Sequence, residues 1–333
     1  MSFIVESNSL ERHKFKKMLN KKNIIRMIVL LVVSLLISGY LYEEYQAKIY
    51  LDQVSGNRIM VNQVNYNYEI YGSGDYIVIV DGASGESILH KKKLMEKFDG
   101  NARLFFYDRP GYGDTEGEYK TPKEIAEDLH FMFRRFGWEM KFILVGEEYG
   151  SLVMQEYLNL YPDEVIGAVF VNPVGEMAGS GEMTRYRDIR TASFFSKEVL
   201  GAVGLPRLMQ NSGVLDFFNE VRLENEEEKE FHANLRLTKN MMSVMKTELS
   251  FMESSESVPI SKNLMGENPF HLITSNRNME RFNQEKYLDY SSDTETFIVQ
   301  DSVSDVMLER PGDISSNLNG LIDKITRLGF RNK

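Results

Sequence analysis

Two acidic residues lie where the sequence predicts a sharp turn between a strand and a helix. The segment ILVGEEYGSL covers residues 143 to 152, and its glycines, Gly146 and Gly150, flank Glu147 and Glu148. A turn of this kind, written G-x-S-x-G, is the frame of a nucleophile elbow, whose middle residue attacks a carbonyl carbon. The middle residue here is Glu148, so the group that could attack is a carboxylate.

A carboxylate nucleophile forms an ester, and cleavage of that ester requires a base that activates water, most often a histidine. The chain has five histidines, His13, His90, His130, His232 and His271. The first lies in a basic tail, the next two on predicted outer helices, and the last inside a predicted strand. Only His232 is placed to approach the turn, and a lone helical histidine is more often solvated or packed than a base.

The elements around the turn alternate between strand and helix. Apolar residues on alternate positions predict half-buried strands between 58 and 71, followed by a buried strand at 76–80. Further strands are predicted at 103–107, 141–145, 165–171, 269–275 and 295–300, and helices near 86–98, 121–137, 150–161 and 314–328. This order predicts right-handed crossovers and a doubly wound α/β fold with a mostly parallel sheet.

The alternation is interrupted between about 175 and 258, where the sequence is helix-like and contains the acidic run ENEEEKE. Its methionines and phenylalanines are expected to form a small helical core. An insertion at this point would lie over the carboxyl ends of the strands, where ligands bind in open α/β folds. We therefore expect a helical cap.

The chain begins with a basic segment followed by an apolar one. Residues 1 to 26 carry seven Lys or Arg and two Glu, and MIVLLVVSLLISGYLY follows at 27–42. With Ile24 and Ile25 this run approaches the roughly 20 residues that a membrane-spanning helix requires. A cleaved signal peptide is the alternative, but no small-residue cleavage site follows the run. The basic flank predicts a cytoplasmic N-terminus and an extracytoplasmic body.

Length, composition and net charge limit the number of domains and the kinds of partner that the protein can have. A chain of 333 residues is long enough for one large α/β domain with an insertion or for two ordinary domains, and we favour the first. Its 42% hydrophobic and 26% charged residues are typical of a globular protein. The net charge is −10, and the part after residue 26 carries −15, which excludes nucleic acid as a partner. The absence of cysteine agrees with an extracytoplasmic body and is typical of a bacterial surface protein.

Over roughly residues 58–330 the chain resembles the α/β-hydrolase fold family. YGSGDYIVIVDGASG (71–85) is similar to the family's hairpin, third strand and oxyanion loop, with Asp81 and Gly82 where His-Gly usually stands. FFYDRPGYGDTE (105–116) is similar to the loop after the fourth strand, and LERPGDI (308–314) to the segment after the catalytic histidine. Together with the elbow, these four segments come in the family's order and spacing.

The resemblance implies a catalytic triad whose three positions are all substituted. The nucleophile position falls on Glu148, the acid position on Asn278 and the histidine position on Ser304. Ser151 and Ser304 offer hydroxyl groups, but neither has an identifiable base. The resemblance also implies an oxyanion site made by the backbone amides of Ala83 and Tyr149, and the Glu148 carboxylate could fill it.

Three pocket residues, Asp81, Gly82 and Glu147, are expected beside the elbow, where the two acids increase the negative charge. A pocket with an acidic entrance could bind a metal ion or an amine. However, the three acids Asp81, Glu147 and Glu148 do not have the spacing of known metal ligands. We therefore expect no metal and no cofactor.

The sequence thus predicts a single-pass membrane protein with a hydrolase-like body. Its predicted parts are a basic cytoplasmic tail (1–23), a transmembrane anchor in the lipid bilayer (24–42), a linker (43–57), an α/β core (58–174 and 259–330) and the cap (175–258). The first hypothesis is a pseudo-hydrolase with a binding or scaffolding role, whose ligand under the cap is a small molecule, lipid or peptide. The alternatives are an active hydrolase of esters, amides or small hydrophobic substrates around Glu148, and a structural domain with a closed pocket.

Overall fold

The computed structural model describes residues 21–54, 56–86, 91–174, 200–214, 225–253, 258–300 and 305–329. The strands are β1 (Asn57–Val61), β2 (Val64–Tyr71), β3 (Tyr76–Asp81), β4 (Ala102–Tyr107), β5 (Phe142–Glu147), β6 (Val165–Val171), β7 (Phe270–Ser275) and β8 (Thr294–Val299). The helices are α2 (Lys21–Leu51), α3 (Lys92–Lys97), α4 (Pro122–Phe136), α5 (Tyr149–Leu160), α7 (Leu205–Asn211), α8 (Glu226–Arg236), α9 (Lys239–Glu253), α10 (Asn276–Arg281), α11 (Val306–Glu309) and α12 (Pro311–Arg327), with short 3₁₀ helices η2 (Pro162–Glu164) and η3 (Gln284–Tyr290).

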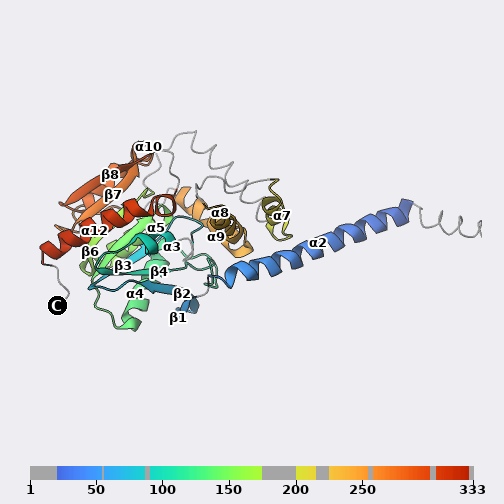
Figure 1. Cartoon of the computed structure of the whole chain (residues 1–333), viewed down its shortest axis with the longest axis horizontal. Helices are drawn as coiled ribbons and strands as arrows, with labels where there is room; N and C mark the ends of the chain where they lie inside the picture. Colours follow the sequence, from blue (N-terminus) through green and yellow to red (C-terminus); the bar gives the residue numbers. More distant parts are fainter. Residues whose placement is uncertain are drawn as a thin grey trace, which may run out of the picture.

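The strands form one sheet in the order β1-β2-β4-β3-β5-β6-β7-β8. The pairs β1–β2 and β2–β4 are antiparallel, and every other pair is parallel. Strand β5 lies near the middle, so its carboxyl end, where Glu148 follows, is flanked by the ends of β3 and β6. The predicted fold class is confirmed, including the mostly parallel sheet (Figure 1).

Helices cover both faces of the sheet. Helices α4, α5 and η3 enclose one buried apolar cluster, and α3, α11 and α12 enclose another on the opposite face. The central strands are buried along their whole length, as expected for parallel strands covered on both sides. This two-sided burial holds the strand ends, and the loops that follow them, in fixed positions.

Helix α4 shows how local sequence sets the element boundaries. Thr121 caps its first turn and exchanges hydrogen bonds with Glu124, which forms a capping box. The helix ends at Gly137, whose φ of 67° is the left-handed conformation that glycine adopts without strain. The sequence predicts this helix at 121–137, and the structure has it at 122–136.

The insertion after β6 contains helices α7, α8 and α9, as the sequence predicts for residues 200–214 and 225–253. Residues 175–199, 215–224 and 254–257, the rest of the predicted cap, lie outside the described residues. A third buried cluster, which includes Met241, Met242 and Met245 of α9, joins the cap to Tyr112 of the core and to Val54. The expected helical core is therefore present, and it is shared with the main domain.

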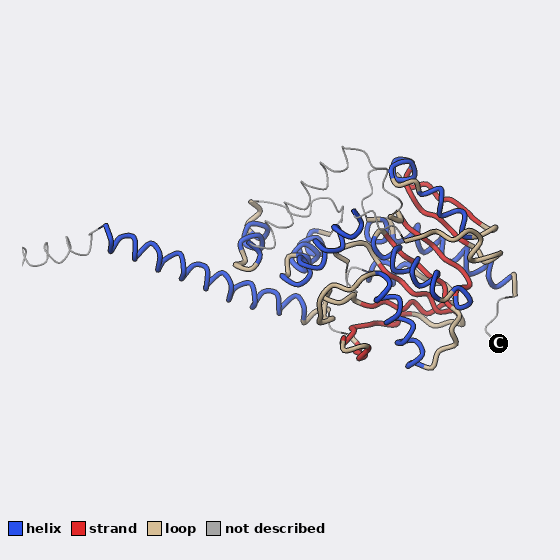
Figure 2. Tube along the Cα trace, turned by 180° about the vertical axis from the view of Figure 1, so that it is seen from behind, coloured by secondary structure: helices blue, strands red, loops and turns tan. Residues whose placement is uncertain are grey.

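Helix α2 continues beyond the predicted anchor into the predicted linker and ends at Leu51. At Gly39 an added Cβ would lie 2.2 Å from the carbonyl oxygen of Val203, so the helix and the segment before α7 touch closely. Arg207 of α7 binds both oxygens of Glu43 at 2.7 Å. Figures 1 and 2 show α2 projecting from the body with α7 beside it.

Among the described residues, α2 is the one helix long and apolar enough to cross a membrane, by length and composition. A signal sequence near an N-terminus would pass the same test. The apolar side chains of residues 27–37 are mostly exposed in the isolated chain, as expected for a helix that lies in lipid.

Candidate functional site at the turn between β5 and α5

Glu148 forms the tip of the turn, with φ 47° and ψ −111°. Such a backbone conformation is strained for a residue with a side chain, and strain of this kind is found at functional sites. The turn is so tight that only glycine fits on either side. An added Cβ would lie 2.7 Å from the Cα of Ser151 at Gly146, and 2.5 Å from the carbonyl oxygen of Asp81 at Gly150.

The Glu148 carboxylate accepts a hydrogen bond from the backbone amide of Ser84, at 2.9 Å from Oε2. Ser84 lies one residue beyond Ala83, whose amide the family resemblance predicts at the oxyanion site. Ala83 is buried, and its carbonyl oxygen accepts from Arg109. Tyr149 is also buried, and its hydroxyl donates to Tyr119 at 3.1 Å. The turn thus keeps an amide donor of the β3 loop aimed at an anion, and that anion is Glu148 itself.

The predicted acid position belongs to a neutral network. Asn278, on α10, donates from Nδ2 to Asn172 Oδ1 at 3.1 Å, and its backbone amide donates to Ser275 Oγ. Thr274 also donates to Asn172 Oδ1, at 3.3 Å. An amide in such a network carries no charge with which to stabilise an imidazolium ion. The predicted histidine position, Ser304, lies outside the described residues.

The three described histidines all have partners away from Glu148. His130 Nδ1 lies 3.2 Å from Glu164, and His271 Nδ1 lies 2.9 Å from Asn317 Oδ1. His232 Nε2 lies 3.2 Å from Arg236, which in turn donates to the carbonyl of Ser84. Within the described part of the chain, no histidine is hydrogen-bonded to the Glu148 carboxylate.

On the cap side of the turn, a buried guanidinium joins two carboxylates. Arg109 Nη1 donates to Asp81 at 2.5 Å, and its Nε donates to Glu248 of α9 at 2.8 Å. Tyr112 and Ser84 also donate to Glu248, and Tyr107 donates to Asp81. Burial disfavours the charged guanidinium, but the two carboxylates outweigh this and raise the pKa of Arg109 further. We call Arg109, Asp81, Glu248 and these hydroxyl donors the Arg109 network.

The Arg109 network fastens the cap to the oxyanion loop. Arg109 also donates to the carbonyl oxygens of Gly82 and Ala83, and its guanidinium lies over the rings of Tyr112 and Tyr149. Asp81 is fully buried in this network. Its side chain therefore does not make the mouth acidic in the way the sequence suggests, because it is directed at Arg109.

Glu147 is directed at the start of α11 and is not part of the Arg109 network. Its two oxygens accept the backbone amides of Val306 and Met307, at 2.6 and 2.9 Å. Its carboxylate lies near those of Glu86 and Asp305, and these are the three described residues that are spaced as metal ligands. The residues predicted from the sequence do not include Glu86, Arg109, Glu248 and Asp305, although three of these four lie in or beside the segments that resemble the hydrolase family.

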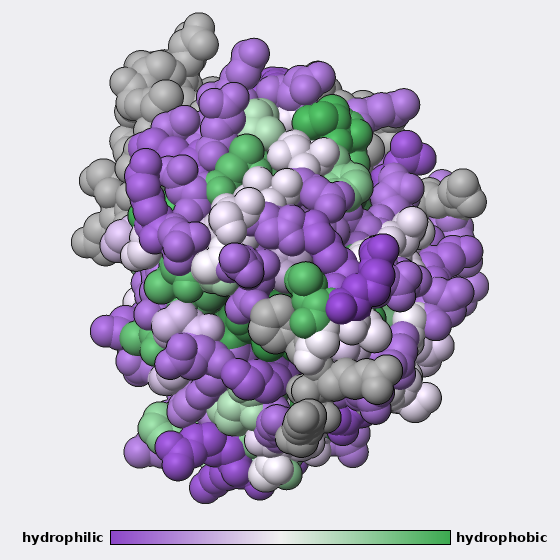
Figure 3. Space-filling view, turned by 90° about the vertical axis from the view of Figure 1, so that its left-hand side faces the viewer, coloured by the Kyte–Doolittle hydropathy of each residue, from purple (hydrophilic) through white to green (hydrophobic). Residues whose placement is uncertain are grey.

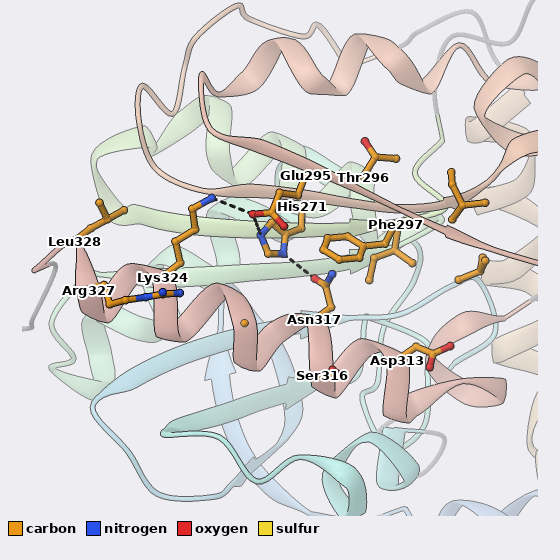
Figure 4. A pocket seen from close by; sticks show the side chains of 14 residues that line it. His271, Glu295, Thr296, Phe297, Asp313, Ser316, Asn317, Lys324, Arg327 and Leu328 are labelled. Carbon is orange, nitrogen blue, oxygen red and sulfur yellow. Dashed lines mark hydrogen bonds and ion pairs between the residues drawn. The ribbon is translucent and has the colours of Figure 1, made fainter.

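A groove of about 1000 Å³ lies elsewhere, between the edge strand β8 and α12 (Figure 4). His271, Glu295 and Asn317 are among its lining residues, and none of the elbow residues is. Figure 3 shows the end of the molecule opposite α2, where apolar residues stand in separate patches among hydrophilic ones. The groove is thus separate from the site at the elbow.

The family model described as the alpha/beta hydrolase fold matches residues 75–220. No curated protein matches the sequence. Among similar solved structures, a membrane phospholipase A described as a bacterial virulence factor has TM-score 0.62 at 14% identity, covering 92% of this chain and 99% of its own. The epoxide hydrolase CorEH gives 0.61 at 12%, covering 81% and 99%. An esterase from Exiguobacterium antarcticum gives 0.58 at 13%, covering 81% and 99%.

The sheet order, the strained turn after β5 and the inserted cap define an α/β protein of the hydrolase type. Since the family model also matches over residues 75–220, the chain has the α/β-hydrolase fold. The resemblance that the sequence suggested is confirmed. At these identities the solved structures establish the fold alone.

Proposed function

We propose that this protein is a membrane-anchored pseudo-hydrolase, which binds a ligand or partner under its cap without hydrolysing it. The observation that carries the proposal is the Glu148 carboxylate at the tip of the elbow, bound to the Ser84 amide. A carbonyl substrate would find a negative charge in place of a neutral hydroxyl. Its developing oxyanion would then compete with Glu148 for the donor.

The surroundings of the elbow support this proposal. Asn278 is neutral, and the described histidines are engaged elsewhere, so neither the acid position nor a described histidine would activate a water molecule there. The Arg109 network also holds Glu248 of the cap against the oxyanion loop. A cap held by a buried ion pair fits a stable binding surface better than a lid that opens at each turnover.

We further propose that α2 anchors the protein in a membrane with its basic N-terminus in the cytoplasm. In this proposal residues 200–214 lie at the membrane surface, which the close contact between Gly39 of α2 and Val203 supports. Leu200, Leu205, Leu208 and Val214 expose between 40% and 67% of their surface there. Lipid is the occupant that matches these side chains, so the ligand under the cap is expected to be an amphiphile from the bilayer.

The lipid contact is tested by placing tryptophan at the cap. In a Trp138→Phe background, Leu208→Trp is expected to be quenched by brominated lipids in nanodiscs. Phe131→Trp, half-exposed on α4, serves as the control and should be much less quenched. Equal quenching at both positions would contradict the membrane contact.

Catalysis is tested on the full chain in nanodiscs with activated esters, phospholipids and a fluorophosphonate probe, with and without divalent cations. We expect neither turnover nor labelling. The strained backbone of Glu148 favours one rival, a hydrolase that uses this carboxylate as nucleophile. Turnover that Glu148→Gln abolishes would establish that rival and overturn our proposal.

A further inference from the structure

Behind the elbow, three segments far apart in sequence bring their acids together. Glu86 comes from the loop after β3, Glu147 ends β5, and Asp305 precedes α11. Each offers one carboxylate oxygen, and these oxygens all lie within 4.8 Å of one another. All three side chains are buried, with 3%, 1% and 7% of the residue surface exposed. Carboxylates this close in the interior repel one another unless a positive charge or protons compensate them.

Glu86 is the member whose charge has no direct partner. Within the described part of the chain, neither of its buried carboxylate oxygens accepts a hydrogen bond from an amide, a hydroxyl or a cationic group, and its close neighbour is the carboxyl group of Asp305. Two cations act on it from a distance, Lys91 and Arg109. Lys91 donates to the carbonyl of Tyr107 at 3.3 Å, and Arg109 is held by Asp81 and Glu248.

The other two members are oriented by the backbone and keep coordinating capacity. Glu147 accepts one amide on each oxygen, and Asp305 Oδ1 accepts the amide of Leu308 at 2.9 Å. A carboxylate oxygen has two lone pairs, so each still has one to offer a ligand. Burial, and then the nearby Asp305 carboxylate, raise the pKa of both Glu86 and Glu147 well above the ordinary range.

We propose that Glu86, Glu147 and Asp305 form a binding site for a hard divalent cation, with Ca²⁺ as the first candidate because it accepts buried carboxylates in flexible geometry. Calcium takes carboxylate oxygens at roughly 2.3–2.6 Å, so two ligands on opposite sides of it lie up to about 5 Å apart. Magnesium, at about 2.1 Å, demands near-octahedral geometry and usually keeps several of its waters, which a buried cluster of three carboxylates favours less. The cation would join the oxyanion loop, the elbow and the segment after the predicted histidine position.

This site differs from the one that the acids around the elbow suggest in sequence. Asp81 belongs to the Arg109 network, and Glu148 is bound to Ser84. Glu148 acts on Asp305 only through its charge. The inference therefore does not rest on whether the elbow is catalytic.

Gly82 makes the position of Glu86 testable by a second route. An added Cβ at Gly82 would lie 1.2 Å from Glu86 Oε2 and 2.4 Å from its Cδ. Gly82→Ala would therefore displace the Glu86 carboxylate, the mobile end of a side chain, while it keeps all three acids in the sequence. Loss of cation binding in this variant would show that binding depends on the position of the Glu86 carboxylate, because the number of acids is unchanged.

The experiment measures thermal unfolding of the full chain in detergent micelles at pH 7.5, after chelation and then with Ca²⁺, Mg²⁺ or Mn²⁺. We expect Ca²⁺ at 100 times its Kd to raise the Tm by about 5 °C. Glu86→Gln and Gly82→Ala should each lose this increment. Glu86→Gln should still fold, because it removes a charge from a repelling group at nearly constant volume.

Two controls keep every acid of the cluster. Glu248→Gln changes a buried acid of the Arg109 network, and Glu116→Gln changes an exposed one. Both should keep the full Ca²⁺ increment, whatever their own Tm. Isothermal titration of the chelated wild type with Ca²⁺ gives a direct measure of binding. A wild type that no cation shifts, or a Glu86→Gln variant that keeps the increment, would overturn the proposal.

Discussion

On the cap side of the elbow, Asp81 and Glu248 share the guanidinium of Arg109, whereas on the α11 side Glu86, Glu147 and Asp305 face one another. Both groups are buried and lie around the same turn. In the first, each acid has a direct ionic partner and hydroxyl donors. In the second, the described partners are backbone amides, and Glu86 has none.

The difference between the two groups shows that buried carboxylates can serve two purposes, the fastening of segments and the binding of a ligand. A carboxylate bound to a buried guanidinium fastens two segments and leaves little capacity for a ligand, which suits a fixed cap. A group of carboxylates that is compensated only in part attracts protons or a cation, which suits a binding site. The same substitution should therefore have opposite effects on the two sides.

Removal of the shared cation should have the largest effect. Arg109→Met leaves Asp81 and Glu248 buried without a positive partner, so the free energy of unfolding should fall by about 3–5 kcal/mol. Urea unfolding in detergent micelles measures this. Arg58→Met is the matched control, because it breaks an exposed pair with Asp114 and should cost about 1 kcal/mol or less. If both variants lost similar amounts of free energy of unfolding, the Arg109 network would contribute no more than an exposed ion pair.

Neutralising the cap acid should cost less. Glu248→Gln keeps the shape but weakens the hydrogen bonds from Arg109, Tyr112 and Ser84, so we expect a loss of about 2 kcal/mol in the same assay. Asp81 remains as a partner for Arg109. An unchanged or increased stability would show that the buried charge of Glu248 is not compensated.

Neutralising Glu86 should act in the opposite direction. Because its folded-state pKa is raised, stability is greatest below the ordinary pKa of about 4.5 and falls as pH rises through the raised value. In the presence of a chelator, Glu86→Gln should reduce this fall and be roughly 1 kcal/mol more stable than the wild type at pH 8.

The comparison of the two pH profiles between pH 5 and 8 isolates Glu86. The other groups that act on it, which include Asp305, Lys91 and Arg109, are present in both proteins. A wild type that becomes more stable toward pH 8, with no difference between the profiles, would contradict an uncompensated cluster.

The smallest effect is expected between the two groups, at the elbow itself. Glu148→Gln keeps an acceptor for the Ser84 amide on a partly exposed side chain, so its stability should change by about 0.5 kcal/mol or less. Urea unfolding measures this change, with the Glu248→Gln variant measured in parallel for comparison. A loss as large as that of Glu248→Gln would mean that Glu148 belongs to one of the buried groups.

Local sequence predicted most elements of the core to within a few residues. Thr121 and Gly137 mark the ends of α4, and the two glycines around Glu148 mark the turn, because capping and close backbone approach depend on neighbouring residues. The linker after residue 42 was less predictable. Helix α2 continues to Leu51 there because Glu43 and Tyr50 contact Arg207 of the cap, a partner about 160 residues away.

By itself, the sequence determined the alternation of strands and helices, the apolar N-terminal helix and a glutamate at the tip of the elbow. Each of these depends on the order of residue types over a short window. Only the tertiary structure decided which acids meet: Asp81 joins Arg109, while Glu147, one residue before Glu148, turns toward Glu86 and Asp305. The strand order of the sheet sets these encounters, and long-range pairing leaves no periodic signal in the chain.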